Sequence, residues 1–166
     1  MKSETLYIAY GSNLNLKQMA FRCPTARVAG SGELKDYELL FRGSRRSAVA
    51  TVEPLKGSAV PVLLWTLRER DLQALDRYEG YPSFYRKEII PVAFAGKTTS
   101  AMVYIMNDGH PLGSPSDYYF NAIMEGYRSA GFDTEFLERA VEKSIRLAQE
   151  QQKQEPEQGL SGLKWR

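Results

Sequence analysis

The sequence has very little of the two residue types that build most metal, redox and nucleophilic sites. It contains one cysteine, Cys23, and one histidine, His110. A single cysteine excludes an intramolecular disulfide and a cysteine-rich zinc site, and a single histidine excludes a multi-histidine metal centre. A Ser–His–Asp or Cys–His mechanism could use only His110. We therefore expect an acid–base enzyme with this sequence to work through a carboxylate, a tyrosine or a lysine.

The sequence also lacks an excess of one charge and a long hydrophobic run. Its 22 basic and 20 acidic residues leave a net charge of +2. Such a balance does not favour a nucleic-acid or membrane-surface partner, because proteins of those classes gather basic residues in a patch. No apolar run approaches the ~20 residues that cross a bilayer, and the N-terminal residues lack the apolar stretch of a signal peptide. We expect a cytoplasmic protein that binds neither nucleic acid nor membrane.

The apolar content is sufficient for one folded domain. The chain has 166 residues, of which 43% are hydrophobic and 25% are charged, and these values are typical of a globular domain with a buried core. Residues 151–159 contain no apolar side chain, so burial cannot offset the entropy of ordering them. We expect a domain over residues 1–150 and a mobile polar tail over residues 151–166, in which Trp165 is an unexpected aromatic residue.

Strand patterns outnumber helix patterns along the chain. Strands are expected over residues 6–10, 26–34, 37–41, 48–52, 60–67, 85–94 and 100–106. Helices are expected from Asn15 to Pro24, over residues 68–78, from a Ser114 cap with Pro115 at the first helical position to Gly131, and after Asp133 or Thr134. Because strands and helices do not alternate strictly, the pattern indicates an α+β domain built around a small barrel or curled sheet.

The first strand ends in a loop of small residues just before a helix. Gly11, Ser12 and Asn13 occupy that loop. Backbone N–H groups at such a turn can bind an anion or an oxyanion, and glycine lets a ligand approach the main chain closely. An ordinary structural turn would show the same residues, so the pattern alone leaves both interpretations open.

A carboxylate occupies a core position on the expected helix over residues 68–78. Glu79 follows Leu72 by seven residues and Leu75 by four, so it lies on their apolar stripe. Desolvation there, together with the helix C-terminus, would raise its pKa and suit it to general acid–base work. Alternatively, the helix ends early and Glu79 faces solvent, or it pairs with Arg77 or Arg86; pairing with Arg86 would lower the pKa instead.

Three stretches in order along the chain resemble the motifs of the γ-glutamylcyclotransferase-like (AIG2-like) family. They are Tyr7-Ile8-Ala9-Tyr10-Gly11-Ser12-Asn13-Leu14, then Leu75-Asp76-Arg77-Tyr78-Glu79-Gly80-Tyr81 with Tyr85-Arg86, then Ser116-Asp117-Tyr118 with Gly126 and Gly131. The resemblance covers residues 6 to 140. It implies a small mixed β-barrel with flanking helices and a single cavity.

The resemblance also implies roles for individual residues. Glu79, the glutamate before a glycine, corresponds to the family's proton acceptor and donor. The first strand and loop bind substrate through backbone groups, which carries over to Tyr7, Ile8, Ala9, Tyr10, Gly11 and Ser12. The third motif supplies a substrate-contacting tyrosine, which carries over to Tyr118, with Tyr119 as the competing assignment. Ser116 stands where the family usually has proline, and this departure affects the register of Tyr118.

The implied reaction is the intramolecular aminolysis of a small-molecule γ-glutamyl amide. It releases 5-oxoproline and a free amine or amino acid, as in glutathione metabolism, with no metal and no cofactor. Two other functions stay open: a non-catalytic binding module of the same fold, and an acyltransferase step on γ-glutamyl intermediates in a biosynthetic pathway. Specificity for the leaving group is expected from Tyr81, Tyr85 and the segment Arg42–Arg46. The arginines of this segment could recognise an anionic substrate group, or the segment could be an ordinary solvated loop. A homodimer is left open.

Overall fold

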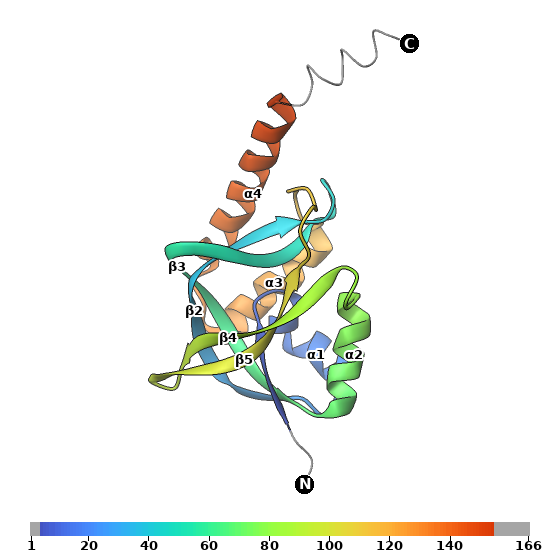
Figure 1. Ribbon diagram of the computed structural model, residues 1–166, viewed down its shortest axis with the longest axis vertical. Helices are drawn as coiled ribbons and strands as arrows, with labels where there is room; N and C mark the ends of the chain where they lie inside the picture. Colours follow the sequence, from blue (N-terminus) through green and yellow to red (C-terminus); the bar gives the residue numbers. More distant parts are fainter. Residues whose placement is uncertain (1–3, 155–166) are drawn as a thin grey trace.

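Five strands close into a barrel in the computed structural model, which describes residues 4–154 (Figure 1). They are β1 (Thr5–Ala9), β2 (Arg27–Arg42), β3 (Val49–Leu67), β4 (Tyr85–Phe94) and β5 (Lys97–Met106). Their order around the barrel is β1-β3-β2-β4-β5. Neighbouring strands are antiparallel, except that β1 runs parallel to β5 where the barrel closes. The predicted mixed barrel with flanking helices is confirmed.

Strands β2 and β3 are each longer than the sequence pattern predicted. Four short strands were expected where the structure has two long ones, which pair from Arg27↔Thr66 to Arg42↔Val49. The register shifts between Lys35 and Tyr37, and Asp36 there has a φ of 66° and accepts a hydrogen bond from the Gly57 amide at 2.9 Å. The turn-forming residues of this region therefore mark an irregularity within a continuous ladder, as β-bulges do, and not the ends of strands.

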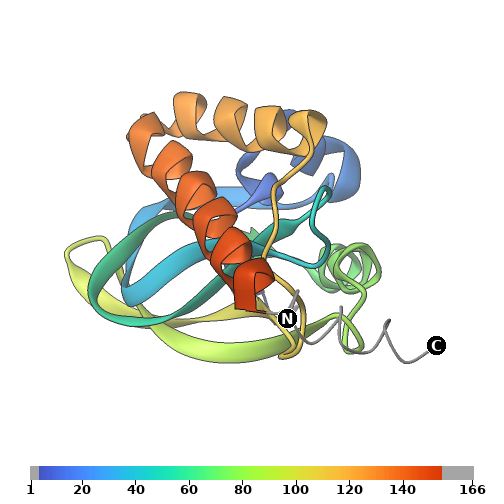
Figure 2. The same ribbon diagram turned by 90° about the horizontal axis from the view of Figure 1, so that it is seen from above.

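The helices lie outside the barrel. They are the short 3-10 helix η1 (Ser12–Leu14), α1 (Leu16–Arg22), α2 (Glu69–Glu79), α3 (Asp117–Ala130) and α4 (Thr134–Gln154). Figure 2 shows α3 and α4 on the same side of the barrel, with α2 at a separate position beside it. As predicted, the Asn15 side chain caps α1 by accepting from the Gln18 amide at 3.0 Å, and Gly131 ends α3 in the left-handed conformation.

The start of α3 differs from the prediction by two residues. The N-cap is Ser116, whose side chain accepts a hydrogen bond from the Tyr119 amide at 3.2 Å. Ser114 cannot cap the helix because its backbone is already bonded to the preceding loop: its amide donates to the Arg45 carbonyl at 2.7 Å, and its carbonyl accepts from the Ala48 amide at 3.1 Å. Pro115 therefore lies before the helix and not within its first turn.

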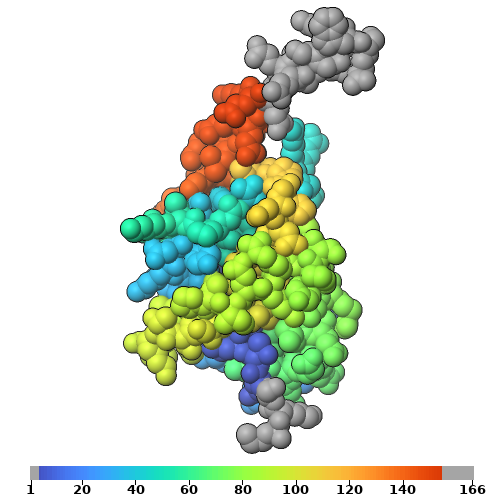
Figure 3. Space-filling view, in the orientation of Figure 1, coloured from blue at the N-terminus to red at the C-terminus, as the bar shows by residue number. Residues whose placement is uncertain are grey.

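The last helix extends beyond the predicted end of the domain. In Figure 3, β4 and β5 cover the front of the barrel and α4 stands above it. Helix α4 continues past Glu150 to Gln154, and the rest of the predicted tail, including Trp165, lies outside the described residues. Within residues 4–154, none of the helices combines the length and the apolarity that a membrane span requires.

Candidate active site

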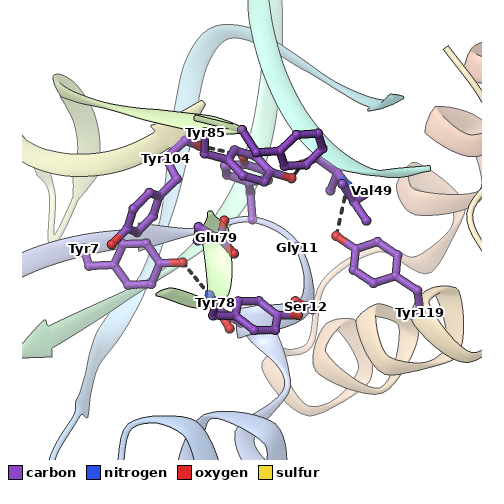
Figure 4. Close-up of a pocket in the computed structure, with 13 residues that line it drawn as sticks. Tyr7, Gly11, Ser12, Val49, Tyr78, Glu79, Tyr85, Tyr104 and Tyr119 are labelled. Atoms are coloured by element: carbon purple, nitrogen blue, oxygen red, sulfur yellow. Dashed lines mark hydrogen bonds between the residues drawn. The ribbon is translucent and has the colours of Figure 1, made fainter. Parts of the chain in front are cut away.

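A cavity of about 240 Å³ lies beside the end of β1 and the last turn of α2 (Figure 4). Its walls come from segments far apart in the sequence. The lining residues are Tyr7, Tyr10, Gly11, Ser12, Asn13, Val49, Ala50, Tyr78, Glu79, Phe84, Tyr85, Tyr104 and Tyr119. The lining is mostly aromatic, and Glu79 is its single carboxylate. A small, largely apolar cavity with a few polar groups is typical of a site for a small molecule.

Glu79 reaches the cavity because of the way α2 ends. Leu75, one turn earlier, is fully buried, and Glu79 follows it on the same face of the helix. Gly80 then takes the left-handed conformation, with a φ of 66°, and stops the helix. The carboxyl group points among the tyrosines of the cavity (Figure 4). Its burial raises the pKa of Glu79 to about 7, although the positive charge of Arg22 acts in the opposite direction.

The structure does not pair Glu79 with either arginine that the sequence offered as a partner. Arg86 donates to the Glu88 carboxylate at 2.7 Å and to the Met106 carbonyl at 2.9 Å. Among the residues that the structure describes, none makes a hydrogen bond or an ion pair with the Glu79 carboxylate. This includes Arg77, the other arginine that had been considered. The pKa therefore remains raised, since a directly bound cation would lower it.

The loop after β1 presents unused backbone donors beside this carboxylate. The loop folds into one tight turn, in which the Leu14 amide donates to the Gly11 carbonyl and the Asn15 amide donates to the Ser12 carbonyl, both at 3.0 Å. Within the described part of the chain, no oxygen accepts from the amides of Gly11, Ser12 or Asn13. Residue 11 must be small here, because an added Cβ would lie 3.1 Å from the Ala50 Cβ.

Hydrogen bonds hold the tyrosine walls of the cavity in place. Tyr10 donates to the Tyr104 carbonyl and Tyr85 donates to the Ala50 carbonyl, both at 2.6 Å. The Tyr119 hydroxyl accepts from the Ala50 amide at 3.0 Å. Burial raises the pKa of Tyr10, Tyr85 and Tyr119 above the ordinary value, so these phenols stay neutral. The cavity is therefore a rigid neutral shell around one titratable carboxyl group.

The structure brings most of the expected site residues together. Tyr7, Tyr10, Gly11, Ser12 and Glu79 all line the cavity. Ile8 and Ala9 are fully buried in β1 and do not line it.

Tyr118 lies outside the cavity, with 80% of its surface exposed, whereas Tyr119 forms part of the wall. The expectation for Tyr118 is thus corrected in favour of Tyr119. The physical reason is the Ser116 cap, which sets the helical rotation so that residue 119 faces the barrel.

Several lining residues had no assigned role in the sequence analysis. They are Asn13, which had been placed in the loop after the first strand without a role for its side chain, and Val49, Ala50, Tyr78, Phe84 and Tyr104. Tyr78 could have been found from its position next to Glu79, and its hydroxyl lies 2.9 Å from the Ser12 Oγ. The lining residues of β3 and β5 could not have been found from the sequence, because only the register of the closed barrel brings them to the cavity.

The structure places the expected specificity residues in different parts of the molecule. Tyr85 lines the cavity, whereas Tyr81 does not. Arg42 also lies elsewhere, in a separate groove, where it pairs with Glu53 and donates to the His110 carbonyl at 3.0 Å.

Metal ligands do not cluster in residues 4–154: no group of three or more His, Cys, Asp or Glu side chains there could hold a metal ion. Tyr7, Asn13 and Glu79 provide oxygen and nitrogen atoms, but Glu79 is the only one of the three that carries a charge.

Comparisons with known proteins agree with the geometry of the site. The family model described as gamma-glutamyl cyclotransferase, AIG2-like, matches residues 7–121. A curated gamma-glutamylcyclotransferase from Homo sapiens is 28% identical over an alignment of 143 residues, which covers 81% of this chain and 76% of the relative. The protein of that name from Mus musculus is 29% identical over the same shares. A solved structure of a gamma-glutamyl cyclotransferase superposes with a TM-score of 0.74 at 27% identity, covering 83% of this chain and 86% of that one.

Proposed function

The chain belongs to the gamma-glutamyl cyclotransferase, AIG2-like family, and on that premise we propose that Glu79 is the proton acceptor and donor of its reaction. Its activity is of the γ-glutamylcyclotransferase type. The observation that carries the proposal is the position of Glu79, a lone carboxylate with a pKa raised to about 7 inside a small cavity. A pKa near the working pH lets one group take up and return a proton.

The proposed substrate is a small γ-glutamyl amide, and the reaction closes a ring within it. Glu79 removes a proton from the substrate's α-ammonium, and the freed amine attacks the γ-carbonyl carbon. The new carbon–nitrogen bond closes the five-membered ring of 5-oxoproline, and the amide bond to the leaving amine breaks. The attacking nitrogen loses two protons in all and the leaving nitrogen gains two, so Glu79 ends as the carboxylate it was at the start.

The walls of the cavity would serve this reaction by holding the substrate in a reactive rotamer. Attack within one molecule needs only the correct orientation of amine and carbonyl, and orientation of this kind contributes strongly to rate. The free amides of Gly11, Ser12 and Asn13 would bind the substrate's α-carboxylate, because converging N–H groups form sites for anions. We include Tyr119, in place of Tyr118, among the residues that contact substrate.

The proposed function is tested by the release of 5-oxoproline from a panel of γ-glutamyl compounds. The panel should contain glutathione, γ-glutamyl amino acids, a γ-glutamyl amine and ε-(γ-glutamyl)lysine, since all share the reacting half. Release from one class supports the cyclotransferase and names its leaving group. A different amide product would indicate an acyltransferase, and binding without turnover would indicate a non-catalytic module; either result would refute the proposal.

The pH dependence of the reaction should report the ionisation of Glu79. Only the carboxylate can accept a proton, so kcat/KM should fall about tenfold per pH unit below the pKa of about 7 and level off above it. Rates of 5-oxoproline release from about pH 4 to about pH 9 would show this limb. An acid limb near pH 4.5, the ordinary value for a glutamate, would mean that the carboxyl group is not desolvated in the free enzyme.

The choice between Tyr119 and Tyr118 can be tested with a matched pair of variants. Tyr119→Phe leaves the buried Ala50 amide without its acceptor, which costs about 1–3 kcal/mol, and removes a hydroxyl from the cavity. We expect kcat/KM to fall by about tenfold or more. Tyr118→Phe changes a side chain that is 80% exposed and should leave both kcat/KM and stability close to wild type. A larger loss for Tyr118→Phe would restore the sequence-based assignment.

A further inference from the structure

A chain of three side chains leads from the surface into the cavity and fixes the direction of each hydrogen bond. Arg22 donates through Nη1 to the Asn13 Oδ1, and the Asn13 Nδ2 donates to the Tyr7 hydroxyl at 2.8 Å. A guanidinium group can only donate, so the amide oxygen of Asn13 must face Arg22. The amide NH₂ then faces Tyr7, and the phenol oxygen must accept. The backbone of Asn13 is held as well, because the Trp65 Nε1 donates to its carbonyl at 3.1 Å.

The proton of the Tyr7 hydroxyl is therefore left for another acceptor. Tyr7 is 4% exposed, and its side chain lines the cavity that contains Glu79. In the part of the chain that the structure describes, no oxygen accepts a hydrogen bond from this hydroxyl. A buried donor without an acceptor is costly, by about 1–3 kcal/mol. Such a donor in a cavity wall is suited to a ligand that brings the acceptor with it.

Glu79 does not take this proton. No hydrogen bond joins Tyr7 to Glu79, and such a bond would stabilise the charged carboxylate and lower its pKa. The pKa of Glu79 is instead raised by burial. Burial also raises the pKa of Tyr7 well above its ordinary range, so its proton stays in place throughout the range in which Glu79 titrates. Figure 4 shows the two groups beside each other, both directed into the cavity.

We propose that the Tyr7 hydroxyl is a catalytic residue that donates a hydrogen bond to the γ-carbonyl oxygen of the substrate, and that Asn13 and Arg22 are the positioning residues that aim it. The proposal rests on the proposed function and extends it to a side chain for which only backbone binding was expected. The γ-carbonyl oxygen becomes an oxyanion when the amine attacks. A donor fixed in advance at that point lowers the barrier, because it needs no reorganisation during the reaction.

A neutral donor is well matched to the rest of the site. A cation at the oxyanion position would lie beside Glu79 and hold its pKa down, which would weaken it as a base. Arg22 instead remains one hydrogen bond further out, where its guanidinium carbon lies 3.5 Å from the centroid of the Tyr78 ring. The hydrogen bonds from Arg22 through Asn13 thus orient the Tyr7 hydroxyl. Because they place no cation beside Glu79, the pKa of Glu79 stays raised.

The first test is Tyr7→Phe, measured on the γ-glutamyl compound that the wild type turns over best. We expect kcat to fall by about 10²–10³-fold, the usual effect of removing one oxyanion donor, with KM changed by less than about threefold. The acid limb of the pH profile should stay where it is in the wild type. Tyr127→Phe is the matched control, because it removes another buried hydroxyl, one without a hydrogen-bond partner and outside the cavity. Its kcat should stay within about twofold of wild type.

The second test keeps the Tyr7 hydroxyl but removes the hydrogen bond that orients it. It also controls for a simple folding defect. In Asn13→Asp the new carboxylate still accepts from Arg22 but can no longer donate, so it would draw the Tyr7 proton toward itself. We expect Asn13→Asp to lose about as much kcat as Tyr7→Phe while unfolding at a similar temperature. The double variant should lose no more than the worse single variant, because both changes remove one interaction.

Several outcomes would overturn the inference. They are a Tyr7→Phe kcat within about fivefold of wild type, a shift of the acid limb in Tyr7→Phe, and kcat losses that multiply in the double variant. In each of these cases the wild type still releases 5-oxoproline, so the proposed function would stand. A wild type that releases none from any member of the panel would refute the proposed function, and this inference with it.

Discussion

Replacing Glu79 with glutamine should reduce 5-oxoproline release by about 10²–10⁴-fold, the range expected when a general acid–base group is lost. Glutamine keeps the size of the side chain and adds no charge, but it cannot accept the proton of the substrate's ammonium group. The pKa of about 7, and the absence of a directly bound cation among residues 4–154, suit Glu79 to the proposed role of base. Initial rates over a range of substrate concentrations would separate kcat from KM, and the loss should appear in kcat.

The same variant should be more stable than the wild type at neutral and alkaline pH, which rules out unfolding as the cause of inactivity. The pKa of Glu79 rises from 4.5 to about 7 on folding, so the folded state retains a proton that the unfolded state has lost. Stability therefore falls as the pH rises from 4.5 to 7, by about 3 kcal/mol for a shift of this size. Glu79→Gln should lack this decrease in thermal scans. A variant that keeps more than a tenth of the activity would contradict the assignment.

The second large effect should come from Gly126→Ala, at the contact between α3 and the loop of the active site. A Cβ at residue 126 would lie 2.6 Å from the Leu14 Cβ and 2.7 Å from the Leu14 carbonyl carbon. Leu14 is fully buried and cannot move aside without shifting the loop. Overpacking of this kind costs about 1–3 kcal/mol or more. For a domain of this size, we expect the melting temperature to fall by about 5–10 °C, together with a higher KM.

The sign of this effect makes the prediction specific. In an unhindered helix, alanine is more favourable than glycine by about 1 kcal/mol, so a stabilised Gly126→Ala would show that α3 does not press on the loop. Ser129→Ala, on the exposed face of the same helix, serves as the control and should change stability by less than about 0.5 kcal/mol. Circular dichroism melts of the three proteins would decide between these results.

Local signals predicted the parts of the site that come from single elements. The strand, loop and helix around Gly11 were readable because a β-rich stretch, a small residue and an N-cap follow one another within a few positions. Glu79 was readable because its spacing from Leu75 places it on a buried stripe, and the structure confirms that position. Its catalytic role stays a prediction until the variant is measured.

The parts that failed depend on contacts between distant segments. The choice between Tyr118 and Tyr119 depends on where α3 begins, and Ser116 is the cap because the backbone of Ser114 is already bonded to Arg45 and Ala48. No local pattern reveals those bonds. Likewise, Tyr104 reaches the cavity only because β5 closes the barrel against β1, through the pairing of Tyr7 with Met102.

That closure makes the order in which the chain is synthesised relevant to its folding. Strand β1 is made first, yet it lies between β3 and β5, so it lacks one neighbour until residue 102 has left the ribosome. The cavity needs even more of the chain, since its lining runs from Tyr7 to Tyr119. Contacts this distant in sequence are slow to form. A nascent chain that stops before β5 would therefore leave one edge of β1 unpaired, which makes it a target for aggregation or for chaperones.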